Sequence, residues 1–199
     1  MEFKIANFVR IKDHRIYNGK KCVFSTPKTR SSVEFLREAY NFLKISYPKF
    51  HKMDELSRLG ILATEALLEE EDLKKDTALV FSNSASSLET DKRHHATIGE
   101  TVSPAVFVYT LPNIVMGEIC IKYGFQNENV FFISEKLDSQ LIENYSVILL
   151  DNLVAKAVVC GWIEWKNDEY DVFLCLVKQE GYMNFSAHNL EALYNFEYE

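Results

Sequence analysis

The sequence has few of the residues that break or cross-link a chain. Its 199 residues include four prolines, seven glycines and four cysteines. The cysteines show no C-x-x-C spacing, and Cys120, Cys160 and Cys175 lie inside apolar segments. Buried free thiols are therefore expected, rather than disulfides or a metal site. The sequence predicts no cofactor.

Long apolar runs and an excess of basic residues are also missing. No apolar run reaches the length of about 18 residues that a membrane-spanning helix needs. The first residues lack the basic and apolar regions of a signal peptide. The net charge of −7 disfavours nucleic acid, because phosphate binding needs clustered cations. We expect a cytoplasmic protein with no membrane span and no nucleic-acid partner.

What is present is the composition of a globular chain, with 47% hydrophobic residues and no internal repeat or linker. A single domain over residues 1–199 is expected. Apolar patterns alternate between strands and helices along the chain. The predicted strands are residues 3–11, 78–81, 129–133, 157–165 and 170–177, and the main predicted helices are residues 29–44, 53–70, 138–152 and a short C-terminal one. This alternation predicts an α/β fold in which helices cover a sheet, and the short connection 166–169 predicts a hairpin.

Residues 103–125 combine the densest local signals. Thr110 is the predicted N-cap of a helix, Pro112 lies in its first turn, and Gly124 ends it. Gly117 interrupts this helix at a cost of about 1 kcal/mol relative to alanine. The glycine predicts that another backbone approaches the helix closely at this position.

Three further segments carry local predictions. Ser31 and Glu34 have the spacing of a capping box at the start of a helix. Residues 12–21 are expected to form a polar connection. The charged segment with His94 and His95 is expected to be a solvated loop rather than a metal site, because adjacent histidines point in different directions.

Three segments between residues 50 and 161 share a pattern with one known family. Residues 52–67 read K-M-D-E-L-S-R-L-G-I-L-A-T-E-A-L, and residues 79–87 form a strand and a serine-rich turn. Residues 103–124 combine S-P-A-V-F, L-P-N and G-E-I with a final glycine. Their order resembles the N-terminal half of the β-ketoacyl-acyl-carrier-protein synthases. The resemblance implies a thiolase-like half-fold, a layered mixed β-sheet covered by α-helices.

The resemblance also implies where a nucleophile would stand. In that family a cysteine ends the next strand and begins a long helix, and two catalytic histidines belong to the C-terminal half. Here the matching strand is residues 129–133, and the residue at its end is Ser134, followed by Glu135. Nothing in the 199 residues matches the histidine-bearing half. The resemblance therefore implies a pseudoenzyme that does not catalyse condensation alone.

The first functional hypothesis is a non-catalytic accessory protein in fatty-acid, polyketide or aryl-polyene type biosynthesis. It would pair with an active 3-oxoacyl-ACP synthase, form a dimer, or hold an acyl-carrier protein. In the family the strand matching residues 129–133 lies at a dimer interface, although a core strand is the alternative. The candidate interface residues are Val130, Phe131, Phe132 and Ile133. The candidate basic patch for an acidic carrier protein is Lys20, Lys21, Lys28, Arg30 and Arg37.

Two other hypotheses remain open. In the first of them, the protein is an acyl transferase or thioesterase that uses Ser134, assisted by Glu135 or a histidine such as His188. No G-x-S-x-G motif supports this hypothesis. Alternatively, it binds a small acyl ligand in an apolar pocket, although such residues are also typical of a core. The candidate pocket residues are Phe107, Tyr109 and Met116.

Overall fold

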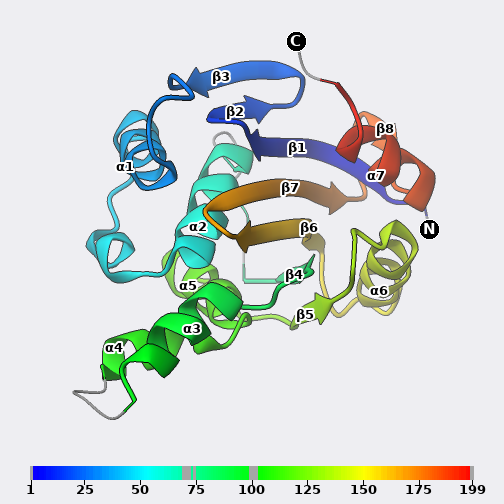
Figure 1. The fold of residues 1–199 in the computed structure, drawn as a ribbon. Helices are drawn as coiled ribbons and strands as arrows, with labels where there is room; N and C mark the ends of the chain where they lie inside the picture. Colours follow the sequence, from blue (N-terminus) through cyan, green and yellow to red (C-terminus); the bar gives the residue numbers. More distant parts are fainter. Residues whose placement is uncertain (1, 69–72, 74, 99–102, 198–199) are drawn as a thin grey trace.

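The computed structural model describes residues 2–68, 73, 75–98 and 103–197, which form an eight-stranded mixed sheet with helices on both faces (Figure 1). The strand order is β3-β2-β1-β7-β6-β4-β5, and β8 pairs with β1. The strands are β1 (Lys4–Lys12), β2 (Arg15–Asn18), β3 (Lys21–Ser25), β4 (Thr77–Asn83), β5 (Asn129–Ile133), β6 (Ala157–Lys166), β7 (Glu169–Lys178) and β8 (Met183–Asn184).

Five strands form the body of the sheet in the order β5-β4-β6-β7-β1. β4 is parallel to both β5 and β6, whereas β7 is antiparallel to both β6 and β1. The parallel pairs need crossovers through helices, while the short turn between β6 and β7 makes the predicted hairpin. The mixed sheet with its helical layers confirms the predicted fold class.

Helices cover the two faces of this sheet unequally. The helices are α1 (Ser32–Phe42), α2 (Glu55–Leu67), α3 (Leu88–Ala96), α4 (Pro104–Phe107), α5 (Ile114–Tyr123), α6 (Ser139–Asp151) and α7 (Ala187–Tyr194), with the 3-10 turns η1 (Pro48–Lys52) and η2 (Val108–Thr110). α1, α2 and α5 enclose the larger core, and α6 and α7 enclose the smaller one. Figure 1 shows these two groups on opposite sides of the strands.

β4 lies between the two cores, and all seven of its residues are buried. Leu79 and Phe81 belong to the larger core, while Ala78 and Val80 belong to the smaller one. A strand covered on both faces needs apolar side chains at successive positions, which explains the unbroken apolar run.

Several predicted ends of helices are confirmed. Ser31 and Glu34 form the reciprocal capping box at the start of α1. Gly124 ends α5 in the left-handed conformation, with φ of 72°. A residue without Cβ adopts this conformation at little cost, which explains why a glycine ends α5.

Two predicted connections are wrong. Residues 12–21 hold the β-hairpin strand β2 and the start of β3 instead of a polar connection. The chain turns between β1 and β2 through Asp13 and His14, both with positive φ, and this pair is not the usual Asn-Gly turn. His94 and His95 lie in the last turn of α3, not in a loop.

The predictions for α5 need two corrections. Its N-cap is Asn113, because Thr110 lies in η2 and its hydroxyl donates to the carbonyl of Phe107. A Cβ atom built on Gly117 would meet nothing within 4 Å. The close approach is instead at Gly60 on α2, where a Cβ atom would lie 2.2 Å from Cγ2 of Val115. The close helix contact therefore depends on the glycine of α2.

The helices in the described part of the chain are short. No single helix there has the length and hydropathy to cross a bilayer. The helices spanning 104–110 and 114–123 reach that threshold only when counted together, and they meet at an angle of 99°.

Candidate functional site

Ser134 directly follows β5, at the carboxyl end of the parallel strands. Its backbone N–H donates to the carbonyl of Asn83, the last residue of β4, at 3.0 Å. Its hydroxyl donates to the carbonyl of Lys136 at 2.8 Å. The resemblance predicted the position of Ser134 at a strand end, but the hydroxyl proton is bonded within its own loop and not to a base.

The helix after β5 does not begin at Ser134. α6 begins at Ser139, and its N-cap is Asp138, whose carboxylate accepts from the backbone N–H of Leu141 at 2.9 Å. A carboxylate at a helix N-terminus satisfies a free N–H and balances the positive end of the helix dipole. The N-terminus of α6 therefore already holds an anion, the carboxylate of Asp138.

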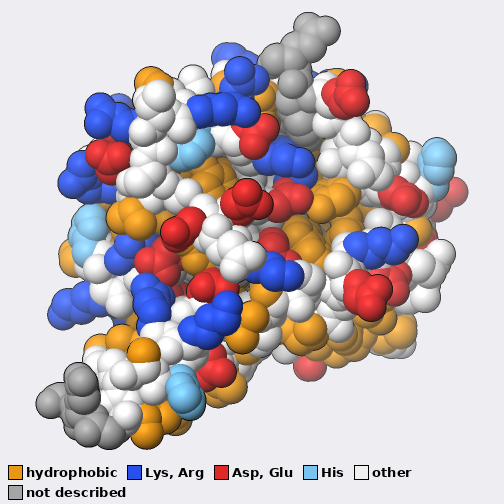
Figure 2. Space-filling model, viewed as in Figure 1, with side chains coloured by type: hydrophobic (Ala, Val, Ile, Leu, Met, Phe, Trp, Pro, Cys, Tyr) orange, Lys and Arg blue, Asp and Glu red, His pale blue; other side chains and the backbone are white. Residues whose placement is uncertain are grey.

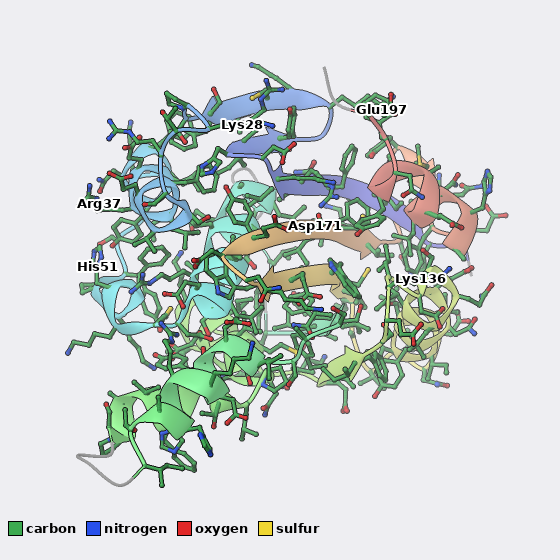
Figure 3. The ribbon with its side chains drawn as sticks, in the orientation of Figure 1. Lys28, Arg37, His51, Lys136, Asp171 and Glu197 are labelled. Atoms are coloured by element: carbon green, nitrogen blue, oxygen red, sulfur yellow. The ribbon has the colours of Figure 1, made fainter. Side chains whose placement is uncertain are left out.

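The two candidate assisting residues, Glu135 and His188, are exposed side chains on different elements. Glu135 is exposed in the loop after β5, and His188 is exposed on α7. Figure 3 labels Lys136, whose carbonyl accepts from Ser134, beside α6. General-base activation of a serine needs the base within about 3 Å of the hydroxyl. The described contacts of Ser134 do not provide that arrangement.

The cysteines are free, as predicted, and three of them are buried or half-buried. Cys160 and Cys175 face each other across the β6–β7 pair. Burial raises the pKa of Cys160 to about 12 and raises the pKa of Cys175 well above its ordinary value. Burial also raises the pKa of Cys120. These thiols stay protonated near neutral pH, so they are poor nucleophiles.

β5 is the edge strand of the sheet next to β4. Its hydrogen bonds to β4 fix which of its backbone N–H and C=O groups face inward and which face outward. The N–H of Leu79 donates to the carbonyl of Glu128, and the N–H of Ser134 donates to the carbonyl of Asn83. Because backbone groups alternate along a strand, Val130 also points its N–H and C=O toward β4. Phe131 and Ile133 consequently direct their N–H and C=O groups toward the open edge.

The side chains of β5 are only partly covered. Val130 and Phe132 pack against the smaller core, and Phe131 packs against the larger one. The ring of Phe132 lies 5.4 Å from that of Tyr145 on α6. Ile133 is 54% exposed. The four predicted interface residues thus share a strand whose outer side has no neighbouring strand among the described residues.

The three predicted pocket residues differ in their burial. Met116 and Tyr109 are buried in the larger core, whereas Phe107 is 60% exposed at the surface. The hydroxyl of Tyr109 donates to the carboxylate of Glu118 at 3.1 Å. The ring of Phe107 lies beside that of His94, 5.2 Å away. Tyr109 therefore makes a contact in the core, whereas Phe107 makes a contact at the surface.

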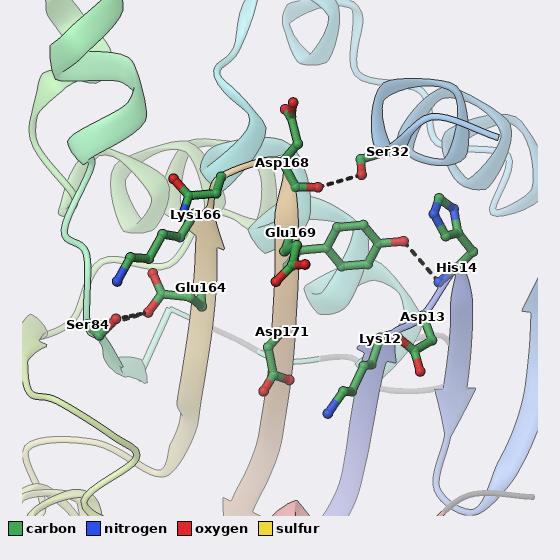
Figure 4. A pocket seen from close by; sticks show the side chains of 12 residues that line it. Lys12, Asp13, His14, Ser32, Ser84, Glu164, Lys166, Asp168, Glu169 and Asp171 are labelled. Atoms are coloured by element: carbon green, nitrogen blue, oxygen red, sulfur yellow. Dashed lines mark hydrogen bonds between the residues drawn. The ribbon is translucent and has the colours of Figure 1, made fainter. Parts of the chain in front are cut away.

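Sequence reasoning missed a charged cavity of about 460 Å³ at the turn ends of β1 and the β6–β7 hairpin (Figure 4). One carboxylate in it, Glu164, accepts from the hydroxyl and the N–H of Ser84, at 2.5 and 2.8 Å, and from the N–H of Ala85 at 3.3 Å. Ser84 is 80 residues away in sequence, so no local signal could reveal this contact. It fastens the turn after β4 to the end of β6.

Charge is distributed unevenly over the face of the molecule that is seen in Figure 2. Figure 2 shows acidic side chains in its centre, and Figure 3 places Asp171 on β7 there. Lys28 and Arg37 of the predicted basic patch lie near β2 and α1 (Figure 3). Lys28 pairs with Asp13 at 3.5 Å, and Arg30 pairs with Glu34 at 3.4 Å. The basic patch is therefore partly neutralised by exposed ion pairs, each of which contributes little to stability.

No family model matches this sequence, and no curated protein matches it. Solved structures do match. The ishigamide ketosynthase/chain length factor has a TM-score of 0.62 and 16% sequence identity, over 90% of this chain and 62% of that chain. A ketosynthase (ApeO) in complex with its chain length factor (ApeC) from Xenorhabdus doucetiae has a TM-score of 0.60 and 13% identity, over 98% of this chain and 90% of that one.

A third similar structure is a type II polyketide synthase acyl-carrier protein in complex with its ketosynthase, AntDE:AntF. Its TM-score is 0.62 and its identity 15%, over 96% of this chain and 64% of that chain. This chain thus spans less than two thirds of the length of two of the three similar chains. At these identities the likeness concerns the fold. The chain has the thiolase-like fold of ketosynthases and chain length factors, as its sequence motifs predicted.

Proposed function

We propose that this protein is a non-catalytic synthase-like subunit that pairs with an active β-ketoacyl-acyl-carrier-protein synthase in fatty-acid, polyketide or aryl-polyene type biosynthesis. The observation that carries the proposal is the open edge of β5, where Phe131 and Ile133 direct backbone groups away from β4. An edge strand with apolar side chains favours pairing with a strand of another chain.

The surroundings of Ser134 support a role without catalysis. Its hydroxyl donates to a carbonyl, and the N-terminus of α6 is capped by Asp138. Neither contact withdraws the hydroxyl proton or stabilises a negative charge on its oxygen. An acyl transferase or thioesterase reaction at Ser134 would need both effects, so we favour pairing over chemistry at this residue.

The similar structures support the kind of partner. Two of them are complexes, one of a ketosynthase with its chain length factor and one of a ketosynthase with an acyl-carrier protein. A subunit of the same fold presents an equivalent edge strand, so two such chains can pair through like surfaces. We infer that a synthase, rather than a carrier protein, is the principal partner of β5.

The direct experiment co-expresses this chain with the β-ketoacyl synthase encoded nearest to it in its genome. Gel filtration with light scattering is expected to give a one-to-one complex. Absence of that complex, or a complex of this chain only with itself, would contradict the proposal.

A second measurement examines chemistry at Ser134. The purified chain is incubated with acyl-carrier-protein thioesters, and its intact mass is compared with that of Ser134→Ala. We expect no acyl adduct on either protein. An adduct that disappears in Ser134→Ala would replace the proposed role with that of an acyl transferase.

A further inference from the structure

A second cavity, of about 670 Å³, is lined by the β1–β2 hairpin and by the chain that follows α7. It adjoins the charged cavity of Figure 4, with which it shares Lys12, Asp13 and Asp171. Figure 3 labels Lys28, Asp171 and Glu197 from its lining. The volume is typical of cavities that hold small organic ligands. The lining side chains determine the chemistry of such a ligand.

The lining includes a buried arginine. The side chain of Arg10 is 4% exposed, and its Nη1 donates to the carboxylate of Asp171 and to the carbonyl of Val172. Its guanidinium carbon lies 4.7 Å from the ring centre of Tyr194. The hydroxyl of Tyr194 also donates to Asp171, at 2.8 Å. These contacts hold the guanidinium group in one position.

The same guanidinium group has donors that the protein does not use. Nε and Nη2 of Arg10 donate to no residue that the structure describes. A guanidinium group carries five N–H groups in a fixed fork, and buried polar groups are nearly always hydrogen-bonded. Because Arg10 lines the cavity, its remaining donors favour an acceptor oxygen inside it.

Two exposed cations stand opposite each other in the same cavity. Lys12 and Arg15 are direct partners in the β1–β2 register and both line the cavity, and we call them the facing cations. Nη1 of Arg15 donates to the hydroxyl of Tyr17 at 3.0 Å, and no carboxylate of the described residues lies within ion-pair distance of either cation. Like charges directly opposite on neighbouring strands destabilise a sheet. An anion bound between the facing cations removes this repulsion.

The carboxylates of the lining do not balance the facing cations. Asp171 is bonded to Arg10, and Asp13 pairs with Lys28 at 3.5 Å. Glu197 is exposed and forms no ion pair with a described residue. Although the whole chain has a net charge of −7, cations therefore outnumber carboxylates in this lining.

We propose that this cavity binds the phosphate group of an organic phosphate monoester between the facing cations, with Arg10 as a further donor. A phosphate monoester carries a charge of about −1.5 to −2 near neutral pH, so it balances both facing cations, whereas a monocarboxylate balances one. The fork of arginine and the compact charge of lysine both suit phosphate oxygens. The organic part lies toward the ring of Phe196, which is 38% exposed and lines the same cavity.

This site is separate from the edge that the proposed function uses. β1 and β2 lie toward one end of the strand order, and β5 is the last strand at the other end. The inference therefore stands or falls independently of the pairing through β5.

The experiment is a calorimetric titration of the 199-residue chain with phenyl phosphate in a phosphate-free buffer. Lys12→Gln with Arg15→Gln removes the facing cations. The control, Lys21→Gln with Arg37→Gln, removes one lysine and one arginine that are exposed outside the cavity. The first variant is expected to weaken binding at least about tenfold and the control less than about threefold, because charge-assisted hydrogen bonds contribute more than screened attraction at a distance.

Two further probes examine the class of ligand. Benzoate, a monocarboxylate with the same ring, is expected to bind at least about tenfold more weakly than phenyl phosphate. Equal affinity for benzoate would overturn the assignment of a phosphate group. Inorganic phosphate that binds as tightly as phenyl phosphate would overturn the assignment of an organic part.

The remaining outcomes concern the site itself. No binding of phenyl phosphate to the parent, or equal weakening by both double variants, would overturn the proposal. Without phosphate, the variant that lacks the facing cations is expected to melt at the temperature of the parent or above it, because a like-charge repulsion is lost. A lower melting temperature would contradict that repulsion and with it the proposal.

Discussion

β4 and β5 are neighbouring parallel strands with opposite surroundings. Every residue of β4 is buried, whereas no residue of β5 is fully buried. Phe81 and Phe131 are direct partners in their register, yet Phe81 is fully enclosed and Phe131 is only partly covered. The same residue type therefore contributes to the core in one strand and to an open edge in the next. The proposed pairing with another chain depends on this difference.

The largest expected effect comes from truncating the two phenylalanines. Phe81→Ala leaves a cavity in the larger core and is expected to lower the free energy of unfolding by about 3–5 kcal/mol. Phe131→Ala removes less buried area and should cost roughly half as much. Urea unfolding of both variants measures the difference. Equal losses would show that β5 is as much a core strand as β4.

Proline substitutions examine the two backbone directions of β5. Val130 directs its N–H toward β4, so Val130→Pro removes a ladder hydrogen bond and should cost about 3 kcal/mol. Ile133 directs its N–H outward, so Ile133→Pro should cost about 1 kcal/mol or less in the isolated chain. Chemical denaturation compares them. The reverse order would mean that the open edge lies on the other set of residues.

The contrast between filled and open surroundings extends to two glycines in adjacent helices. Gly60→Ala places a Cβ atom against Val115 and should destabilise the protein by about 1–3 kcal/mol through overpacking. Gly117→Ala meets open space and should stabilise α5 by up to about 1 kcal/mol. Thermal unfolding should therefore shift in opposite directions. A loss of stability in Gly117→Ala would restore the original prediction of close packing there.

The smallest effect concerns two aspartates that both cap helices. Asp54 caps α2 and is buried, whereas Asp138 caps α6 and is exposed. Burial raises the pKa of Asp54 above its ordinary value, although hydrogen bonds from Ser57 and Thr90 oppose the shift. The stabilisation linked to a raised pKa is complete below the unfolded pKa and is lost as pH rises through the folded pKa.

Asp54→Asn keeps the cap but has no charge to bury. The free energy of unfolding of Asp54→Asn should equal that of the parent near pH 3. Above the unfolded pKa of about 4, the variant should become more stable than the parent as the pH rises. Asp138→Asn, at an exposed cap, serves as the control. Denaturation midpoints at acid and neutral pH measure both variants. An Asp54→Asn protein less stable than the parent at neutral pH would contradict the assignment.

Sequence patterns predicted the elements that carry a continuous apolar run or a strong apolar periodicity. The elements predicted in this way are β4, β5, the β6–β7 hairpin, α1, α2 and α6. α3 was missed because Thr90 is its single buried residue, so the helix has no apolar stripe. β2 was missed because the turn that joins it to β1 uses Asp13 and His14 instead of Asn-Gly. Local pattern alone does not reveal such elements.

The candidate site was predictable only in part. The family motifs placed Ser134 at a strand end, but its bond to Lys136 and the late start of α6 depend on the loop conformation. The contact between Ser84 and Glu164 joins segments 80 residues apart. A glycine in a helix signals a cost but not the direction that its missing side chain would take. This explains why Gly117 was assigned the contact that Gly60 makes.

The most direct measurement of the central claim is the affinity of the synthase for the parent and for Ile133→Pro. The substitution removes one outward N–H of β5 and leaves the groups that face β4 in place. We expect Ile133→Pro to weaken binding at least about tenfold while the isolated chain remains folded. Unchanged binding by a folded Ile133→Pro protein would contradict pairing through the edge of β5.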